Sequence, residues 1–113
     1  MGNQIPKQSR ETVYGRDGYQ CQNCGQRASD YHHRRTRAVH DAHTNCPCNA
    51  VYLCHGCHMW MHEHVEDARK RGMIVSRYEA EPESVPVVTW QGVRWFRCYG
   101  AAEFIDPDLH TAS

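Results

Sequence analysis

Two Cys-x-x-Cys pairs constrain the fold of this chain more than any other feature of its sequence. The first pair is Cys21 and Cys24, and the second is Cys54 and Cys57. Two such pairs match the ligand spacing of a tetrahedral zinc site made of four thiolates, and zinc suits soft thiolates without adding redox chemistry. A closed shell of four cysteines leaves no open coordination position, so we predict a structural zinc ion that stabilises a small fold.

The length of the chain supports a metal-stabilised fold. A chain of 113 residues predicts one domain, 1–113, whose hydrophobic core is marginal without a metal or similar support. Residues 1–10 are polar, so we expect a mobile arm and no signal peptide. No apolar run approaches the roughly 20 residues of a membrane span. We therefore expect a cytoplasmic protein with no membrane partner, in which clustered cysteines bind metal rather than form disulfides.

The other three of the seven cysteines have a less clear role. Cys46 and Cys48 are separated by one residue, which is unusual for a zinc knuckle. They could replace one of the two pairs, or they could be free thiols in a polar loop, and we favour free thiols. Cys98 stands alone and is expected to be a packed thiol. A redox protein is a distant alternative, because the Cys-x-x-Cys pairs lack a βαβ context.

Short apolar segments and turn signals predict an α+β fold. Residues 10–19 are expected to form a short helix or an extended segment that ends at the turn pair Asp17-Gly18. Two short strands are predicted, at 30–33 and 51–53, on either side of a long polar loop over 34–48, whose length favours a functional role. A helix is expected to begin near Cys57 or His58 and to end before Gly72, with a buried stripe formed by Met61, Val65 and Ala68.

The end of the chain, 79–113, reads as an acidic extension that contains a β-hairpin. Residues 73–78 are expected to form a strand or an extended segment. Residues 87–90 and 93–97 are expected to form two strands joined at Gln91-Gly92, with Trp90 and Trp95 in the core. The last residues are acidic and expected to be loose. Up to residue 78 there are eleven basic and seven acidic residues, against two basic and six acidic afterwards. A basic face beside an acidic tail suits a polyanion, although ordinary solvated charge explains the pattern equally well.

Histidines adjoin the predicted strand and helix. His58 and His62 are four residues apart, so on a helix they lie on one face and can share a metal ion, whereas exposed surface histidines are the alternative. His32 and His33 are neighbours at a strand end, where successive side chains point to opposite sides. One of the two can therefore bind metal while the other faces a substrate.

Two segments of the chain resemble the HNH endonuclease family. They are Tyr31-His-His-Arg34 and Asn49-Ala-Val-Tyr-Leu-Cys-His-Gly-Cys-His58. His33, Asn49 and His58 match the His-Asn-His series, and a zinc knuckle is interleaved as in that family. The match covers about residues 19–72. It implies a ββα-metal (His-Me) finger, in which two short strands, a loop and a helix surround one divalent ion.

The resemblance also implies a role for each residue that matches. His33 would be the general base, and His32, His58 and His62 would bind the catalytic divalent ion. Asn49 would hold the loop and orient His33 through hydrogen bonds. Neutral histidine suits proton abstraction near pH 7, and a divalent ion stabilises charge on a phosphodiester. Imidazole binds several metals, so Mg2+, Mn2+, Ni2+ and Zn2+ all remain candidates.

A metal-dependent DNA endonuclease that nicks or cuts double-stranded DNA is therefore the predicted function. Arg34, Arg35 and Arg37 are expected to contact DNA phosphates, and a solvated basic loop is the alternative. A catalytically silent zinc-binding module for nucleic acid or protein is the alternative function, although it would need only the four cysteines. Small HNH proteins are common in phages, where some act beside the DNA-packaging terminase. The resemblance thus implies that partner and the bacterial host cytoplasm.

Overall fold

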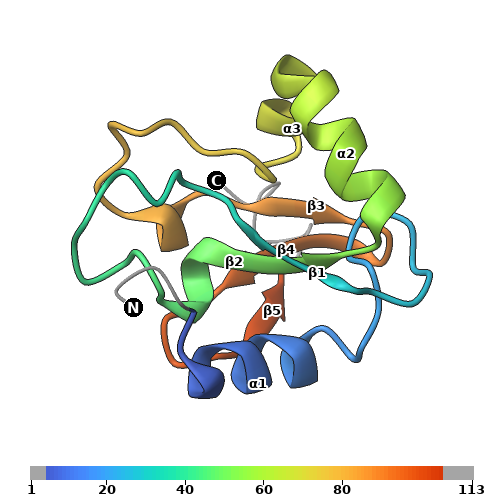
Figure 1. Ribbon diagram of the computed structural model, residues 1–113, viewed down its shortest axis with the longest axis horizontal. Helices are drawn as coiled ribbons and strands as arrows, with labels where there is room; N and C mark the ends of the chain where they lie inside the picture. The colour runs from blue at the N-terminus through green and yellow to red at the C-terminus, as the bar shows by residue number, and fades with distance from the viewer. Residues whose placement is uncertain (1–4, 106–113) are drawn as a thin grey trace.

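Two antiparallel sheets and three α-helices make up the structure, a computed structural model that describes residues 5–105 (Figure 1). This composition agrees with the predicted α+β class. In chain order the elements are α1 (Lys7–Arg16), β1 (Asp30–His33), β2 (Ala50–Leu53), α2 (His55–Glu63), α3 (Val65–Lys70), β3 (Val87–Thr89), β4 (Gly92–Phe96) and β5 (Ala102–Phe104). Short 3-10 turns cover Pro47–Asn49 and Pro82–Ser84.

The first sheet pairs β1 with β2, as the two predicted short strands require. The strands are antiparallel, with His32 opposite Val51 and His33 opposite Ala50. Every residue of β2 is buried, because α1 packs on one side of the sheet and the main core lies on the other. Helix α1 begins at Lys7 and ends at the predicted turn pair. The expected arm therefore includes helical residues, while residues 1–4 lie outside the described part.

The predicted single helix is in fact two helices that meet at His64 (Figure 1). Helix α2 begins earlier than expected, because the Cys54 thiol accepts a hydrogen bond from the backbone N–H of Cys57 and caps the first turn. His64 has φ −129° and ψ 59°, which is not helical, so the chain changes direction before α3. The break shifts the phase of the apolar stripe. Met61 and Ala68 are buried as predicted, but Val65 is 38 % exposed.

Gly72 ends α3, as the sequence predicts. Its φ of +69° favours glycine, and a Cβ atom there would overlap the carbonyl oxygen of Pro86. The backbone N–H of Val88 donates to the carbonyl of Arg71 at 2.8 Å, so the helix end is fixed against β3. Residues 73–78 contain no strand and run as turns and irregular chain, which corrects the expected extended segment.

The predicted hairpin is present, and a further strand extends it into the three-stranded sheet β3-β4-β5. Thr89 pairs with Gly92, so the connecting residues are Trp90 and Gln91, one position earlier than expected. The indole of Trp90 covers Gly25 in the first Cys-x-x-Cys turn instead of entering the core. Strand β5 lies in the stretch expected to be loose, and residues 106–113 lie outside the described part.

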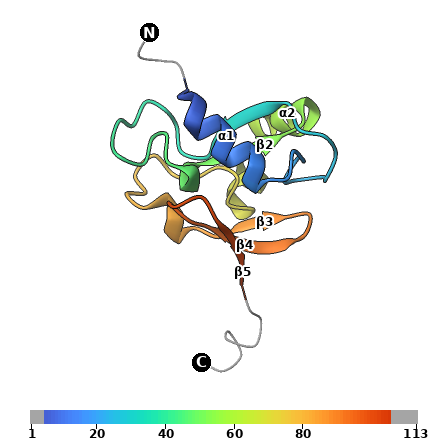
Figure 2. The same cartoon turned by 90° about the horizontal axis from the view of Figure 1, so that it is seen from below.

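The main hydrophobic core joins both sheets to α2 and α3, whereas α1 packs on a smaller cluster that contains Val13, Ala50 and Tyr52. The main core contains Val51, Leu53, Met61, Ala68, Met73, Val87 and Phe96, all fully buried. Members of this core come from β2, α2, α3 and the three-stranded sheet. The three-stranded sheet forms a separate layer beside β1 and β2 (Figure 2). In the described range, no helix is both long enough and apolar enough to cross a membrane.

Candidate functional site

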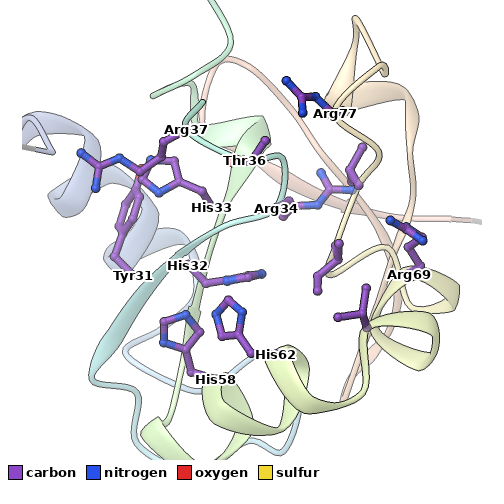
Figure 3. Close-up of a pocket in the computed structure, with 13 residues that line it drawn as sticks. Tyr31, His32, His33, Arg34, Thr36, Arg37, His58, His62, Arg69 and Arg77 are labelled. Atoms are coloured by element: carbon purple, nitrogen blue, oxygen red, sulfur yellow. The ribbon is translucent and has the colours of Figure 1, made fainter. Parts of the chain in front are cut away.

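Three histidines from two elements gather at the centre of the candidate site. His32 comes from β1, and His58 and His62 come from one face of α2. One ring nitrogen from each lies within 4.8 Å of the others. The rings point toward one another, with centroids 5.0 Å apart for His58 and His62 and 5.1 Å apart for His32 and His58 (Figure 3). The structure thus brings together the three ligands that the sequence analysis named.

Hydrogen bonds fix the tautomers of two of these histidines. His32 donates from Nε2 to the carbonyl oxygen of Met73 at 2.8 Å, and His58 donates from Nδ1 to Oδ2 of Asp30 at 2.9 Å. The other nitrogen of each ring keeps its lone pair, which is the usual arrangement of metal-bound histidine and its outer hydrogen-bond acceptor. Three convergent imidazoles, two of them held in this way, fit a divalent metal ion.

The charges around the three histidines support the same conclusion. Burial lowers the pKa of His32 to about 4, so its ring is neutral at pH 7. Hydrogen bonds from His58, Ser29 and His55 lower the pKa of Asp30 to about 2, which keeps this carboxylate ionised. The sequence analysis missed Asp30. The sequence could have indicated Asp30, because a carboxylate two positions before His32 lies on the same face of a strand.

His33, the expected general base, lies on the opposite side of β1 from the three-histidine group. Figure 3 shows its ring beside Tyr31 and Arg37, and the Tyr31 and His33 ring centroids are 5.1 Å apart. Its Nε2 donates to Oδ1 of Asn45 at 3.2 Å, which leaves Nδ1 able to accept a proton. Partial burial lowers the pKa of His33, so the neutral ring is favoured.

Asn49 holds the loop but does not touch the His33 ring, which corrects part of its expected role. Its side chain is fully buried and accepts from the backbone N–H of Arg35 at 2.7 Å. Its amide group donates to the carbonyls of Arg35 and Thr44. Asn49 therefore fixes the backbone just after His33, while Asn45 orients the imidazole. No spacing in the sequence marked Asn45.

Arg34 and Arg35 are internal, which corrects their expected contact with DNA. Each is only 1 % exposed. The guanidinium of Arg34 donates to carbonyl oxygens of four residues, Cys48, Gly72, Pro82 and Val85. Arg35 donates to the Glu79 carbonyl and pairs with Asp41. Irregular loops leave such carbonyls unpaired, and a guanidinium with five donors satisfies several at once. Arg37 is exposed.

A cavity of about 590 Å³ connects the three-histidine group with His33 (Figure 3). The buried Arg34 lines it together with Arg37, Arg69 and Arg77, and the last three come from different segments of the chain. Arg69 reaches the cavity because α3 turns away from α2 at His64. The sequence analysis named Arg34 and Arg37 and missed Arg69 and Arg77, since only the folded chain places them together.

The four cysteines of the two Cys-x-x-Cys pairs also converge. Their sulfur atoms lie within 4.8 Å of one another, and those of Cys24 and Cys54 are 3.8 Å apart. Zn–S bonds of about 2.3 Å at tetrahedral angles place two sulfurs about 3.8 Å apart. Asn23 donates a hydrogen bond to the sulfur of Cys57 at 3.4 Å. This group could hold a metal ion and is compatible with structural zinc.

A second cysteine group lies elsewhere in the molecule. The sequence analysis expected separate thiols at Cys46, Cys48 and Cys98. In the structure these three residues lie together with His43, and the four ligand atoms are within 4.8 Å of one another. Cys98 is exposed rather than packed in the core. Spacing along the chain gave no hint of this group, because Cys98 is 55 positions from His43.

No family model, curated protein or solved structure matches the chain. Conclusions about function therefore rest on the chemistry of the site. That site combines three convergent imidazoles, a fourth imidazole across the strand whose lowered pKa favours its neutral form, and four arginines that line one cavity. Such a combination suits binding of an anionic ligand beside a divalent ion and transfer of a proton next to it.

Proposed function

We propose that this protein is a metal-dependent DNA endonuclease of the HNH type, with β1, β2 and α2 as its ββα-metal finger. One observation carries the proposal: His33 and the three-histidine group line the same cavity. A module that only grips nucleic acid needs neither three convergent imidazoles, two of them with fixed tautomers, nor a neutral histidine beside them. The four-cysteine group holds a structural zinc ion in this proposal and stabilises the start of α2.

The residues divide the hydrolysis of a phosphodiester between them. A divalent ion held by His32, His58 and His62 would supply Lewis-acid stabilisation of negative charge on the phosphate oxygens. His33 accepts the proton of the attacking water at Nδ1, since its Nε2 is bound to Asn45. Its lowered pKa keeps the base unprotonated at neutral pH. Arg37, Arg69 and Arg77 position the DNA backbone through its phosphates.

The setting of the activity is part of the proposal. Thiol-rich metal sites suit a reducing cytoplasm. The likeness of residues 31–34 and 49–58 to phage HNH proteins supports a role in phage DNA processing, with double-stranded DNA as substrate and the packaging terminase as partner. The chain would nick or cut with low sequence specificity when it acts alone.

A plasmid assay tests the proposal. Supercoiled DNA is incubated with wild type, His33→Ala and the control His40→Ala, each with Mg2+, Mn2+, Ni2+ or Zn2+ or with EDTA, and the zinc content of every sample is measured. His40 is exposed, in the same loop, and outside the three-histidine group. We expect metal-dependent nicking or linearisation that His33→Ala reduces roughly 10²–10⁴-fold, while His40→Ala keeps it.

Two results would contradict the proposal. Cleavage that His33→Ala leaves unchanged would remove His33 as the base. Absence of cleavage with every ion, from protein that retains its zinc and still binds DNA, would favour a non-catalytic zinc-binding module.

A further inference from the structure

We propose that His43, Cys46, Cys48 and Cys98, here called the Cys3His group, form a second structural zinc site. Their four ligand atoms converge within 4.8 Å, as do those of the four-cysteine group. The two groups together contain all seven cysteines of the chain. This inference stands on the ligand geometry and does not depend on the nuclease activity proposed above.

The distances within the Cys3His group match ligands around one ion. Nδ1 of His43 is 3.6 Å from the sulfur of Cys48 and 3.9 Å from that of Cys98. Zinc bonds of about 2.3 Å to sulfur and about 2.0 Å to nitrogen, at tetrahedral angles, place sulfur and nitrogen about 3.6 Å apart. A nitrogen and two sulfurs at these separations can share one small cation without a large rearrangement.

Local backbone structure holds the ligands in place. His43 and Cys46 lie in one turn, with the N–H of Cys46 donating to the carbonyl of His43 at 3.2 Å, and a 3-10 turn then presents Cys48. His43 thus supplies the ligand that a second Cys would supply in an ordinary knuckle, which explains the unusual Cys46-Pro-Cys48 spacing. Cys98 arrives from the turn between β4 and β5, where Gly100 has φ +98°.

Charges near the group suit a zinc ion with three thiolates. Three thiolates and one neutral imidazole around Zn2+ leave one net negative charge. The buried guanidinium of Arg34 donates to the carbonyl oxygen of Cys48 at 2.6 Å and so lies close to that charge. Glu83 borders the group, with Oε2 3.5 Å from Nδ1 of His43, but it is not one of the four converging ligands.

A zinc ion at this site would stabilise the fold at a second place, in addition to the ion of the four-cysteine group. It joins the long polar loop between β1 and β2 to the turn between β4 and β5 of the three-stranded sheet. Asn45, which orients His33, lies between two of its ligands, His43 and Cys46. A closed four-ligand shell makes the ion structural, and the ion would hold this loop in the conformation that the His33 contact requires.

Metal counting tests the site without any activity assay. Zinc is replaced by cobalt, and the thiolate-to-cobalt absorption is titrated, because this signal reports cysteine-bound ions and not an ion held only by histidines. Wild type is compared with Cys46→Ser and Cys98→Ser, and with the controls His40→Ala and Glu83→Gln. We expect two cysteine-bound ions per chain in wild type and both controls, and one in each cysteine variant.

A paired substitution at His43 keeps the test decisive if a cysteine variant fails to fold. His43→Cys retains four ligands and should keep two ions with a changed cobalt spectrum, whereas His43→Ala should weaken or lose the second. One cysteine-bound ion in wild type would overturn the inference, as would two ions in Cys98→Ser. Rapid alkylation of Cys46, Cys48 and Cys98 in the folded, zinc-loaded protein would overturn it as well.

Discussion

Asp30 is the residue whose removal should most clearly separate metal binding from folding. Its carboxylate accepts hydrogen bonds from His58 and His55 and is partly exposed. Asp30→Asn removes the charge that orients His58, and loss of such an outer partner typically weakens metal affinity 10–100-fold. Calorimetric titration with Ni2+ or Mn2+ measures the effect. Glu63→Gln is the control, because it removes an exposed carboxylate from α2, the helix of His58. An equal loss of affinity in Glu63→Gln would assign the effect of Asp30 to general electrostatics.

The pH dependence of cleavage should reflect the environment of His33. Burial lowers its pKa below the ordinary value of about 6.5, and a cation bound beside it acts in the same direction. The base works when unprotonated, so kcat/KM should fall only as the pH drops below about 6.5. Asn45→Asp places a carboxylate against Nε2, which should raise the pKa and shift this acidic limb to higher pH. A limb that does not move in Asn45→Asp would assign it to another group.

At the scale of elements, the junction of α3 with β3 depends on the absence of a side chain at Gly72. Gly72→Ala combines a left-handed backbone with overlap on Pro86, and we expect a loss of more than about 2 kcal/mol in unfolding free energy. Gly15→Ala is the matched control, since that Cβ meets nothing within 4 Å and α1 should gain roughly 0.5–1 kcal/mol. Urea unfolding of the zinc-loaded proteins compares the two. Similar values would show that the α3–β3 junction relaxes freely.

The elements show where sequence patterns suffice and where they do not. Helical spacing put His58 and His62 on one face, and strand alternation separated His32 from His33, because both periods are local geometry. The break at His64 was not predictable, since no Gly or Pro marks that position in the sequence. Tertiary contacts decided the rest: the chain gave no sign that Cys98 joins His43 or that Asn45 meets His33.

At the scale of the whole molecule, the buried Arg34 connects segments that no strand pairing joins. Its guanidinium satisfies carbonyls in the 3-10 turns, after α3 and before β3. Arg34→Met leaves these carbonyls without that partner, and we expect a loss of at least about 3 kcal/mol in unfolding free energy. Arg37→Met should change stability by less than about 0.5 kcal/mol, as is usual for surface positions.

Filter binding and thermal unfolding of the same two variants separate their effects. Arg37→Met should weaken DNA binding and lower its salt dependence by about one ion, as expected for a phosphate contact. Stability that is unaffected in Arg34→Met would contradict the internal role of Arg34. Arg34, which directly follows His33 in the sequence, is thus the arginine that stabilises the fold.

The shared hydrophobic core has a consequence for how the chain is made. Met61 of α2 and Ala68 of α3 pack in one core with Val87 and Phe96, which lie much later in the sequence. During synthesis the segment that holds β1, β2, α2, α3 and the four-cysteine group is complete before the covering sheet has been translated. At translation rates of about 5–20 residues per second, the apolar face of α2 and α3 stays exposed for on the order of 2–8 s, until the three-stranded sheet has been synthesised. In that interval a nascent chain would be most open to chaperones and to aggregation, so slow translation after residue 70 should reduce the yield of soluble protein.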